Sequence, residues 1–334
     1  MKEEIAQMQS YIDKFPSDMK EAFDIGSKAV EAFNTQKVDS VLIVGLGGSG
    51  IGGRICQNLV FSYCSAPIEI LNSYDIPAWV NSHTLLVAVS YSGNTEETLN
   101  AYKQARKKGC QIACISSGGS LTEMAKQDGV NIIEIPGGQP PRTSFGYNAS
   151  QLFFILESYK LLSESFSAEL KNVAEGLIEK KNLIKSRAKN VAEGLQGSLP
   201  VIYAPSNLEG VAIRMRQQIN ENAKMLCWHH VLPEMNHNEL VGWADNHDNI
   251  AVVFLYSDLD HPKVEIRRKL TRDILKPKVK NLFEIKAEGK TLLEQSYYLI
   301  HLGDWVSYYL AEIGDVDPIE INVIDTLKSE LAKQ

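Results

Sequence analysis

The feature that most constrains the fold is the alternation of short apolar runs with helical segments from residue 38 onward. The runs at residues 41–44 and 85–89 end at glycine or serine, so they predict strands that are buried on both faces. Similar runs occur at residues 68–71, 111–115 and 131–135. Strands that alternate with helices indicate a parallel sheet covered on both sides. The predicted fold class is therefore α/β and doubly wound.

The second half of the chain repeats this rhythm. Its strands are expected at residues 200–204, 250–256 and 281–285, and its helices at residues 211–225 and 262–275. Residues 206–210 and 257–260 stand where the glycine-rich and serine-rich loops stand in the first half. The sequence thus predicts two copies of one α/β unit, of which only the first keeps those loops.

Four segments follow from this organisation. We expect N-terminal helices over residues 1–37, a first domain over 38–150, a helical connector over 151–196, and a second domain with C-terminal helices over 197–334. Within the first segment, Pro16 is followed by Ser17 and Asp18, a pattern that predicts the end of one helix and the start of another.

Composition excludes several classes of protein. The chain has 41 acidic and 34 basic side chains, a net charge of −7, so it lacks the basic face expected for nucleic-acid or anionic-membrane binding. No apolar run approaches the roughly 18 residues of a membrane span, and the N-terminus does not read as a signal sequence. Five cysteines form no CxxC pair. These observations predict a cytoplasmic protein whose cysteines are small core residues.

The glycine-rich loop at residues 45–50 lies between a predicted strand and a predicted helix. Backbone N–H groups at such a helix start can face an anion. The loop matches G-x-G-x-x-G, and Glu69 follows about 20 residues later, as a dinucleotide site requires. A tight, well-packed turn is the simpler alternative.

A second loop favours a ligand site over a simple turn. Ser90, Ser92 and Thr95 follow the next buried strand and open a helix. Helix capping needs one hydroxyl, whereas three hydroxyls beside a glycine are available here. A cradle for a monophosphate needs hydroxyl and amide donors from two adjacent loops, so the pair of loops favours a phosphomonoester ligand.

The motifs resemble a known family at this point. Residues 87–98 look like the phosphate-binding signature of sugar isomerase (SIS) domains. Four further motifs narrow the resemblance, at residues 47–50, 140–142, 220–222 and 233–239. Together they are similar to the bifunctional phosphoglucose/phosphomannose isomerases, which have two SIS domains. The resemblance implies interconversion of glucose 6-phosphate or mannose 6-phosphate with fructose 6-phosphate in a homodimer, without metal or cofactor.

The resemblance also implies a role for individual residues. Glu221 matches the base that shuttles a proton through a cis-enediol(ate), and Arg142 matches the arginine that stabilises its negative charge. His237, expected from the neighbouring subunit, and Lys328 match the residues that open the sugar ring. The resemblance also implies that the phosphate is bound by Gly48, Ser49, Ser90, Ser92 and Thr95.

Other interpretations stay open on the sequence. A nicotinamide-dependent oxidoreductase would use the glycine loop and Glu69, and a non-catalytic phosphosugar sensor would bind without turnover. A metal hydrolase built on His229, His230 and His237 has no recognisable ligand spacing. One departure bears on specificity, because Ile319 and Ile321 occupy a segment where family members often carry a hydroxyl. Activity toward mannose 6-phosphate is therefore less secure than activity toward glucose 6-phosphate.

Overall fold

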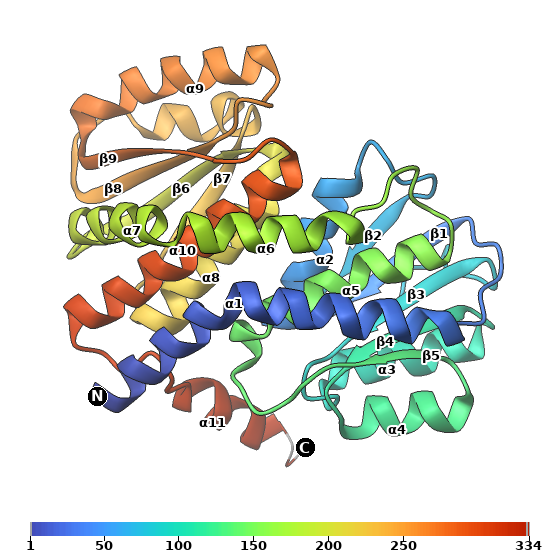
Figure 1. The fold of residues 1–334 in the computed structure, drawn as a ribbon. Coiled ribbons are helices and arrows are strands. Elements are labelled where there is room, and N and C mark those ends of the chain that lie inside the picture. The colour runs from blue at the N-terminus through green and yellow to red at the C-terminus, as the bar shows by residue number, and fades with distance from the viewer. Residues whose placement is uncertain (1, 332, 334) are drawn as a thin grey trace.

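The computed structural model describes residues 2–331 and 333, and contains two parallel sheets joined by a layer of helices (Figure 1). The first sheet has the order β2-β1-β3-β4-β5 and the second has the order β7-β6-β8-β9. Every strand pairing within the two sheets is parallel. The α/β fold class expected from the sequence is confirmed.

The first sheet is built from the strands that the sequence predicts. They are β1 (Ser40–Val44), β2 (Ile68–Leu71), β3 (Thr84–Val89), β4 (Gln111–Ser116) and β5 (Asn131–Glu134). All residues of β3 are buried, as expected for a central strand between two helical layers. The helices of this half are α2 (Gly47–Val60), α3 (Glu96–Lys107), α4 (Gly119–Asp128) and α5 (Phe145–Ser158).

The second sheet repeats the order of the first four strands. Its strands are β6 (Leu199–Pro205), β7 (Trp228–Leu232), β8 (His247–Tyr256) and β9 (Val279–Lys286). Strand β7 is missing from the sequence prediction because only one of its residues, Leu232, is buried. An edge strand with two histidines and an exposed Trp228 lacks the apolar run that marks the other strands.

The remaining helices are α6 (Leu170–Glu179), α7 (Lys181–Leu195), α8 (Glu209–Ala223), α9 (Pro262–Leu275), α10 (Leu292–Gly314) and α11 (Asn322–Leu331). Helix α10 packs against both α7 and α8 in the layer between the sheets (Figure 1). One apolar core runs through this layer and includes residues of both halves, among them Phe145, Met215 and Trp305. The domain limits at residues 38–150 and 197–334 stay a prediction.

The prediction of a helix break at Pro16 is wrong. Helix α1 runs without interruption from Lys2 to Ala29, with Pro16 inside it. A proline within a helix costs about 3 kcal/mol because it removes one backbone hydrogen bond. Met8, Ile12 and Met19 bury one face of α1 on both sides of the proline, where the helix packs against α5 and α6. This tertiary burial outweighs the local cost.

Two properties of the whole chain complete the description. Within residues 2–331 and 333, no helix is both long enough and apolar enough to cross a bilayer. All five cysteines are free, and four of them are buried, which fits their expected role as small core residues.

Candidate active site

The glycine-rich and serine-rich loops meet at the carboxyl edge of the first sheet. Strands β1 and β3 are neighbours, with Val44 opposite Ala88, so the loops that follow them start side by side. The strand order reverses between β1 and β3, and ligands of open α/β sheets bind at such a switch point. The two loops are also joined directly, because the backbone N–H of Tyr91 donates to Ser49 Oγ at 3.1 Å.

The glycine-rich loop presents an uncapped helix start. Helix α2 begins at Gly47, which has a positive φ of +53°, and no side chain of the described residues caps it. The N–H of Ser49 donates to Leu46 O at 3.1 Å, so the amides of Gly47 and Gly48 are the ones placed to face an anion. Gly48 serves another purpose, since a Cβ there would lie 2.9 Å from Pro141 O and 3.0 Å from Arg142 N. Glycine at this position lets the segment that carries Arg142 touch the loop.

The serine-rich loop holds its hydroxyls toward one another. Ser90 Oγ donates to Thr95 Oγ1 at 2.9 Å and accepts from the N–H of Thr95 at 3.4 Å, while Ser92 Oγ accepts from the N–H of Asn94. Thr95 occupies the N-cap position of α3, yet its side chain makes no capping hydrogen bond within the described chain. Simple helix capping therefore does not account for these hydroxyls.

The position of Glu69 argues against a dinucleotide site. Glu69 is the second residue of β2 and lies opposite Leu42, two residues before the end of the strand at Leu71. Two residues of a strand span about 6.6 Å, so the carboxylate starts well short of the edge where the glycine loop begins. At that edge, Asn72 Nδ2 donates instead to Gly45 O at 2.7 Å.

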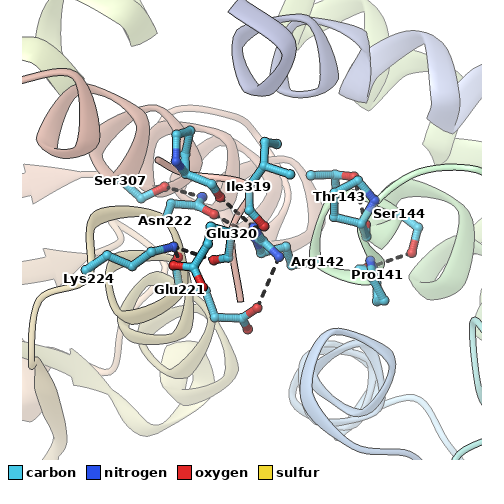
Figure 2. Close-up of polar contacts among 12 residues, drawn as sticks. Pro141, Arg142, Thr143, Ser144, Glu221, Asn222, Lys224, Ser307, Ile319 and Glu320 are labelled. Atoms are coloured by element: carbon cyan, nitrogen blue, oxygen red, sulfur yellow. Dashed lines mark hydrogen bonds and ion pairs between the residues drawn. The ribbon is translucent and has the colours of Figure 1, made fainter. Parts of the chain in front are cut away.

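A buried arginine joins the first half of the chain to the second. Arg142 is only 3% exposed, and its Nη1 lies 3.4 Å from Glu221 Oε2 (Figure 2). Its Nε donates to Asn222 Oδ1 at 2.7 Å, and Nη2 donates to Pro318 O at 2.5 Å. Burial lowers the pKa of Arg142, while the charges of Glu221 and Asp317 oppose that shift. An arginine with these neighbours remains a guanidinium cation.

A second group of polar residues contacts the backbone of this arginine. Arg214 Nη2 donates to Arg142 O at 3.2 Å and to Asp304 Oδ2 at 2.7 Å. Gln218 Nε2 donates to the other oxygen of the same carboxylate, Asp304 Oδ1, at 3.0 Å. Burial raises the pKa of Asp304, and the positive charge of Arg214 opposes it. The ion pair is therefore buried, hydrogen-bonded and directly in contact with the backbone of Arg142.

The side chain of Asn222 is fixed in the same way. Its Nδ2 donates to Ser307 Oγ at 2.9 Å, and that hydroxyl donates to Asp304 O. Because one amide bridges Arg142 and Ser307, the orientation of the guanidinium is set by α8 and α10 together (Figure 2). Glu221 retains 27% side-chain exposure, so its carboxylate can be reached by a substrate.

The structure does not connect every predicted site residue. Arg142 and Glu221 lie together, and the glycine-rich loop approaches the backbone of Arg142 at Gly48. His237 ends the short helix η5 (Glu234–His237) and is exposed, and Lys328 lies on α11, which has no buried side chain. In the part of the chain that is described, no three His, Cys, Asp or Glu side chains gather as metal ligands, and His229, His230 and His237 form no such group.

Several residues of this centre escaped the sequence reasoning. Arg214, Gln218, Ser307 and Lys224 carry no motif that the resemblance names. Asp304 did leave a signal, because it is a single carboxylate within a largely apolar stretch of α10. A charge in such a position is rarely tolerated without a buried partner.

The sequence is similar to those of several known proteins. Over residues 184–331 the chain matches the family of bacterial phospho-glucose isomerase C-terminal SIS domains. A bifunctional phosphoglucose/phosphomannose isomerase of Caldicellulosiruptor bescii is 36% identical over 329 residues, which cover 95% of this chain and 97% of that protein. A D-glucosamine-6-phosphate 4-epimerase of Sulfolobus acidocaldarius is 31% identical over 251 residues, which cover 74% of this chain and 77% of that protein.

A solved structure shares the fold at low sequence identity. The C-terminal domain of glucosamine-fructose-6-phosphate aminotransferase from Francisella tularensis superposes with a TM-score of 0.75 at 15% identity. The superposition covers 94% of this chain and 98% of that one, so both sheets and the helices between them are included. Because the sequence identity to the isomerase of Caldicellulosiruptor bescii extends over nearly the full length of both chains, this chain belongs to the bifunctional phosphoglucose/phosphomannose isomerase family.

Proposed function

We propose that this chain is an aldose–ketose isomerase that interconverts glucose 6-phosphate, mannose 6-phosphate or both with fructose 6-phosphate. The observation that carries the proposal is the contact between a buried Arg142 and a partly exposed Glu221, beside two loops suited to a phosphate. Family membership supports the same reaction class.

Each group has a chemical task in this reaction. Glu221 takes the proton from C2 of the aldose and returns it to C1, through a cis-enediol(ate). Arg142 faces the oxygens on which negative charge develops, and its Nη1 is free for this because only the 3.4 Å contact with Glu221 engages it within the described residues. Loss of one such preorganised donor costs about 3 kcal/mol of transition-state stabilisation.

The phosphate is assigned to the loops of the first half. Gly48 supplies an amide at the uncapped start of α2, and Ser49, Ser90, Ser92 and Thr95 supply hydroxyls. Since the net charge of the chain is −7, this local field must attract the anionic substrate against the overall charge.

Ring opening is assigned to His237 and Lys328, with His237 coming from the partner in a homodimer. The exposure of His237 supports this, because a histidine that serves a neighbouring subunit has to project from its own. Val241, four residues further on, is 85% exposed, which fits a surface that a second copy covers. We assign the protein to the cytoplasm on its free cysteines.

The first experiment is an assay of purified protein with fructose 6-phosphate in the presence of EDTA, in which glucose 6-phosphate and mannose 6-phosphate are followed separately. Formation of glucose 6-phosphate establishes the isomerase, and formation of both products shows that Ile319 and Ile321 permit the mannose epimer. Binding of fructose 6-phosphate without any turnover identifies a sensor. A parallel assay supplies glucosamine 6-phosphate, and conversion of that substrate alone identifies an epimerase.

Two variants assign the base. Glu221→Gln is expected to abolish turnover while substrate binding stays near that of the wild type, because the amide keeps the shape of the side chain but cannot accept the proton. Glu209→Gln, on the first turn of the same helix, is the matched control and should retain full activity. Substantial activity in Glu221→Gln would remove Glu221 from this role.

A mixing experiment tests the shared site. Inactive Glu221→Gln protein and inactive His237→Ala protein are combined and allowed to exchange subunits. Mixed dimers contain one intact site if His237 acts across the interface, so partial activity should return. No recovery after verified exchange would place His237 and Glu221 of one site on the same chain.

A further inference from the structure

The C-terminal end of α8 carries an unusual residue. Lys224 is the C-cap of this helix and has a φ of +56°, in the left-handed region. Glycine or asparagine normally ends a helix in this conformation, because an L side chain there costs conformational energy. A lysine at this position thus has a cost that a simple helix end does not require.

The ammonium group of Lys224 bridges two backbone carbonyls. Its Nζ donates to Glu221 O at 2.6 Å and to Glu320 O at 2.7 Å (Figure 2). The first carbonyl lies in the last turn of α8, where carbonyls have no partner within the helix. The second lies two residues before α11 begins at Asn322. One side chain therefore connects the helix of Glu221 with the entry to α11.

The same short segment, residues 317–320, is held from its other side by the site arginine. Arg142 Nη2 donates to Pro318 O and to Ile319 O, at 2.5 and 3.2 Å. Asp317 Oδ1 accepts the N–H groups of Ile319 and Glu320, which folds the segment into a turn. Consecutive carbonyls of this turn are thus bound by two cations of the site.

Helix α11 depends on this attachment. None of its side chains is buried among the described residues, so apolar packing contributes little to its attachment to the rest of the chain. Burial and the charge of Arg142 lower the pKa of Lys224, while the carboxylates of Glu320, Asp317 and Glu221 oppose that shift. The two cations are therefore balanced by nearby carboxylates, and both remain available as donors.

We propose that Lys224 is a positioning residue, which ties the helix of Glu221 to residues 317–320 and thereby holds Arg142 and α11 in the geometry required for isomerisation. This inference rests on the proposed function, since it concerns the same site. The competing explanation is that Lys224 merely ends α8 and that its side chain contributes nothing to the reaction.

Lys224→Gly separates the two explanations. Glycine relieves the left-handed strain and removes the ammonium group, so we expect a thermal stability equal to or above that of the wild type. We also expect kcat with fructose 6-phosphate to fall about tenfold, because small displacements of catalytic groups have large effects on rate. KM should change less than about threefold, because the phosphate loops are untouched. Lys224→Arg should keep most of the activity, since a guanidinium can also donate to two carbonyls.

The chain offers a matched control at Lys160. This lysine has nearly the same backbone conformation, with φ +57°, but no hydrogen bond or ion pair of its side chain occurs among the described residues. Lys160→Gly therefore relieves the same strain without removing a bridge. It should leave kcat and KM unchanged.

Hydrogen exchange supplies a measurement that does not depend on turnover. Amides of residues 317–331 should exchange faster in Lys224→Gly than in the wild type. Their exchange rates in Lys160→Gly should equal those of the wild type. Faster exchange together with reduced kcat supports the proposal. Unaltered exchange overturns it, whether or not kcat falls. If the wild type shows no isomerase activity, faster exchange still supports the bridge, and the proposed function alone fails.

Discussion

Gly48 is a position where a single added methyl group should disturb the site by displacing Arg142. It is the second residue of α2, and a Cβ there would lie 2.9 Å from Pro141 O and 3.0 Å from both Cα and N of Arg142. All three atoms belong to the backbone, so no side chain can rotate away. To reach an ordinary contact of 3.4 Å, the segment with Arg142 has to move by about 0.5 Å.

The expected effect of Gly48→Ala follows from that displacement. A misplacement of 1 Å can cost about 100-fold in rate, so half of it predicts a loss of about tenfold in kcat. Overpacking costs about 1–3 kcal/mol, and the better helix propensity of alanine returns up to about 1 kcal/mol. The free energy of unfolding should therefore fall by about 1–2 kcal/mol.

Gly52→Ala is the control on the same helix. Its Cβ would meet Ala149 at 3.4 and 3.5 Å, which are ordinary contact distances, and its backbone is helical. This variant should gain about 0.5–1 kcal/mol in stability and keep its activity. The measurements are initial rates with fructose 6-phosphate and urea unfolding curves of both variants. A folded Gly48→Ala protein with wild-type kcat would refute the claim that the contact between Gly48 and Arg142 sets the geometry of the site.

Three further perturbations test other parts of the structure. Arg142→Lys should lower kcat about 100-fold in steady-state assays with little change in folding cooperativity, because lysine cannot bond Asn222, Glu221 and two carbonyls at once. Asp304→Asn breaks a buried ion pair and should lower the free energy of unfolding in urea by about 3 kcal/mol; an unchanged midpoint would show that Arg214 finds another partner. Burial, aided by the charge of Glu21, raises the pKa of Asp18 from 3.8 to about 6, so its contribution to stability is present below pH 4 and is lost as the pH rises through 6. Asp18→Asn should therefore raise the free energy of unfolding at pH 8 by up to about 3 kcal/mol, and with it Tm. In a series of Tm measurements across pH, this gain should vanish at pH 4.

Local chemistry explains why much of the fold could be predicted from the sequence. Helix α9 begins at Pro262 and ends at Leu275, as expected, because proline favours the first helical position. Strand β3 was recognisable because burial on both faces produces a continuous apolar run. Where packing overrides local preference, the prediction failed, as at Pro16 within α1 and along the half-exposed strand β7.

In the site, too, features formed by neighbouring residues could be predicted, whereas contacts between residues far apart in the sequence could not. The phosphate loops were visible because each is a continuous stretch with its own hydroxyls and glycines. The contact between Arg142 and Glu221 joins residues 79 positions apart, and the bridge from Arg142 to Ile319 spans 177. Neither pairing leaves a periodic pattern, so only the family resemblance pointed to these residues, and nothing pointed to Lys224.

The two halves share a strand order but differ at the starts of the helices that follow their strands, and under the proposed function this difference confines the phosphate to the first half. In the first half, no side chain of the described residues caps α2 or α3. In the second half, His261 caps α9 through the N–H of Lys263, and Asn58 Oδ1 accepts the N–H of Gly210 at the start of α8.

The two halves also differ in the carboxylates that lie near these helix starts. The loop of residues 257–260 stands in the second half where the first half has residues 90–95, and it carries Asp258 and Asp260, of which Asp260 Oδ2 accepts the N–H of Ser257. The amides that could hold a phosphate are thus already bonded, and the nearby negative charge would repel one. The second half contributes Glu221, and its helix α8 packs against α2 so that Glu221 meets Arg142 beside the loops of the first half. Under the proposed function, substrate binding and proton transfer therefore come from different halves of the chain, and neither half alone contains a complete site.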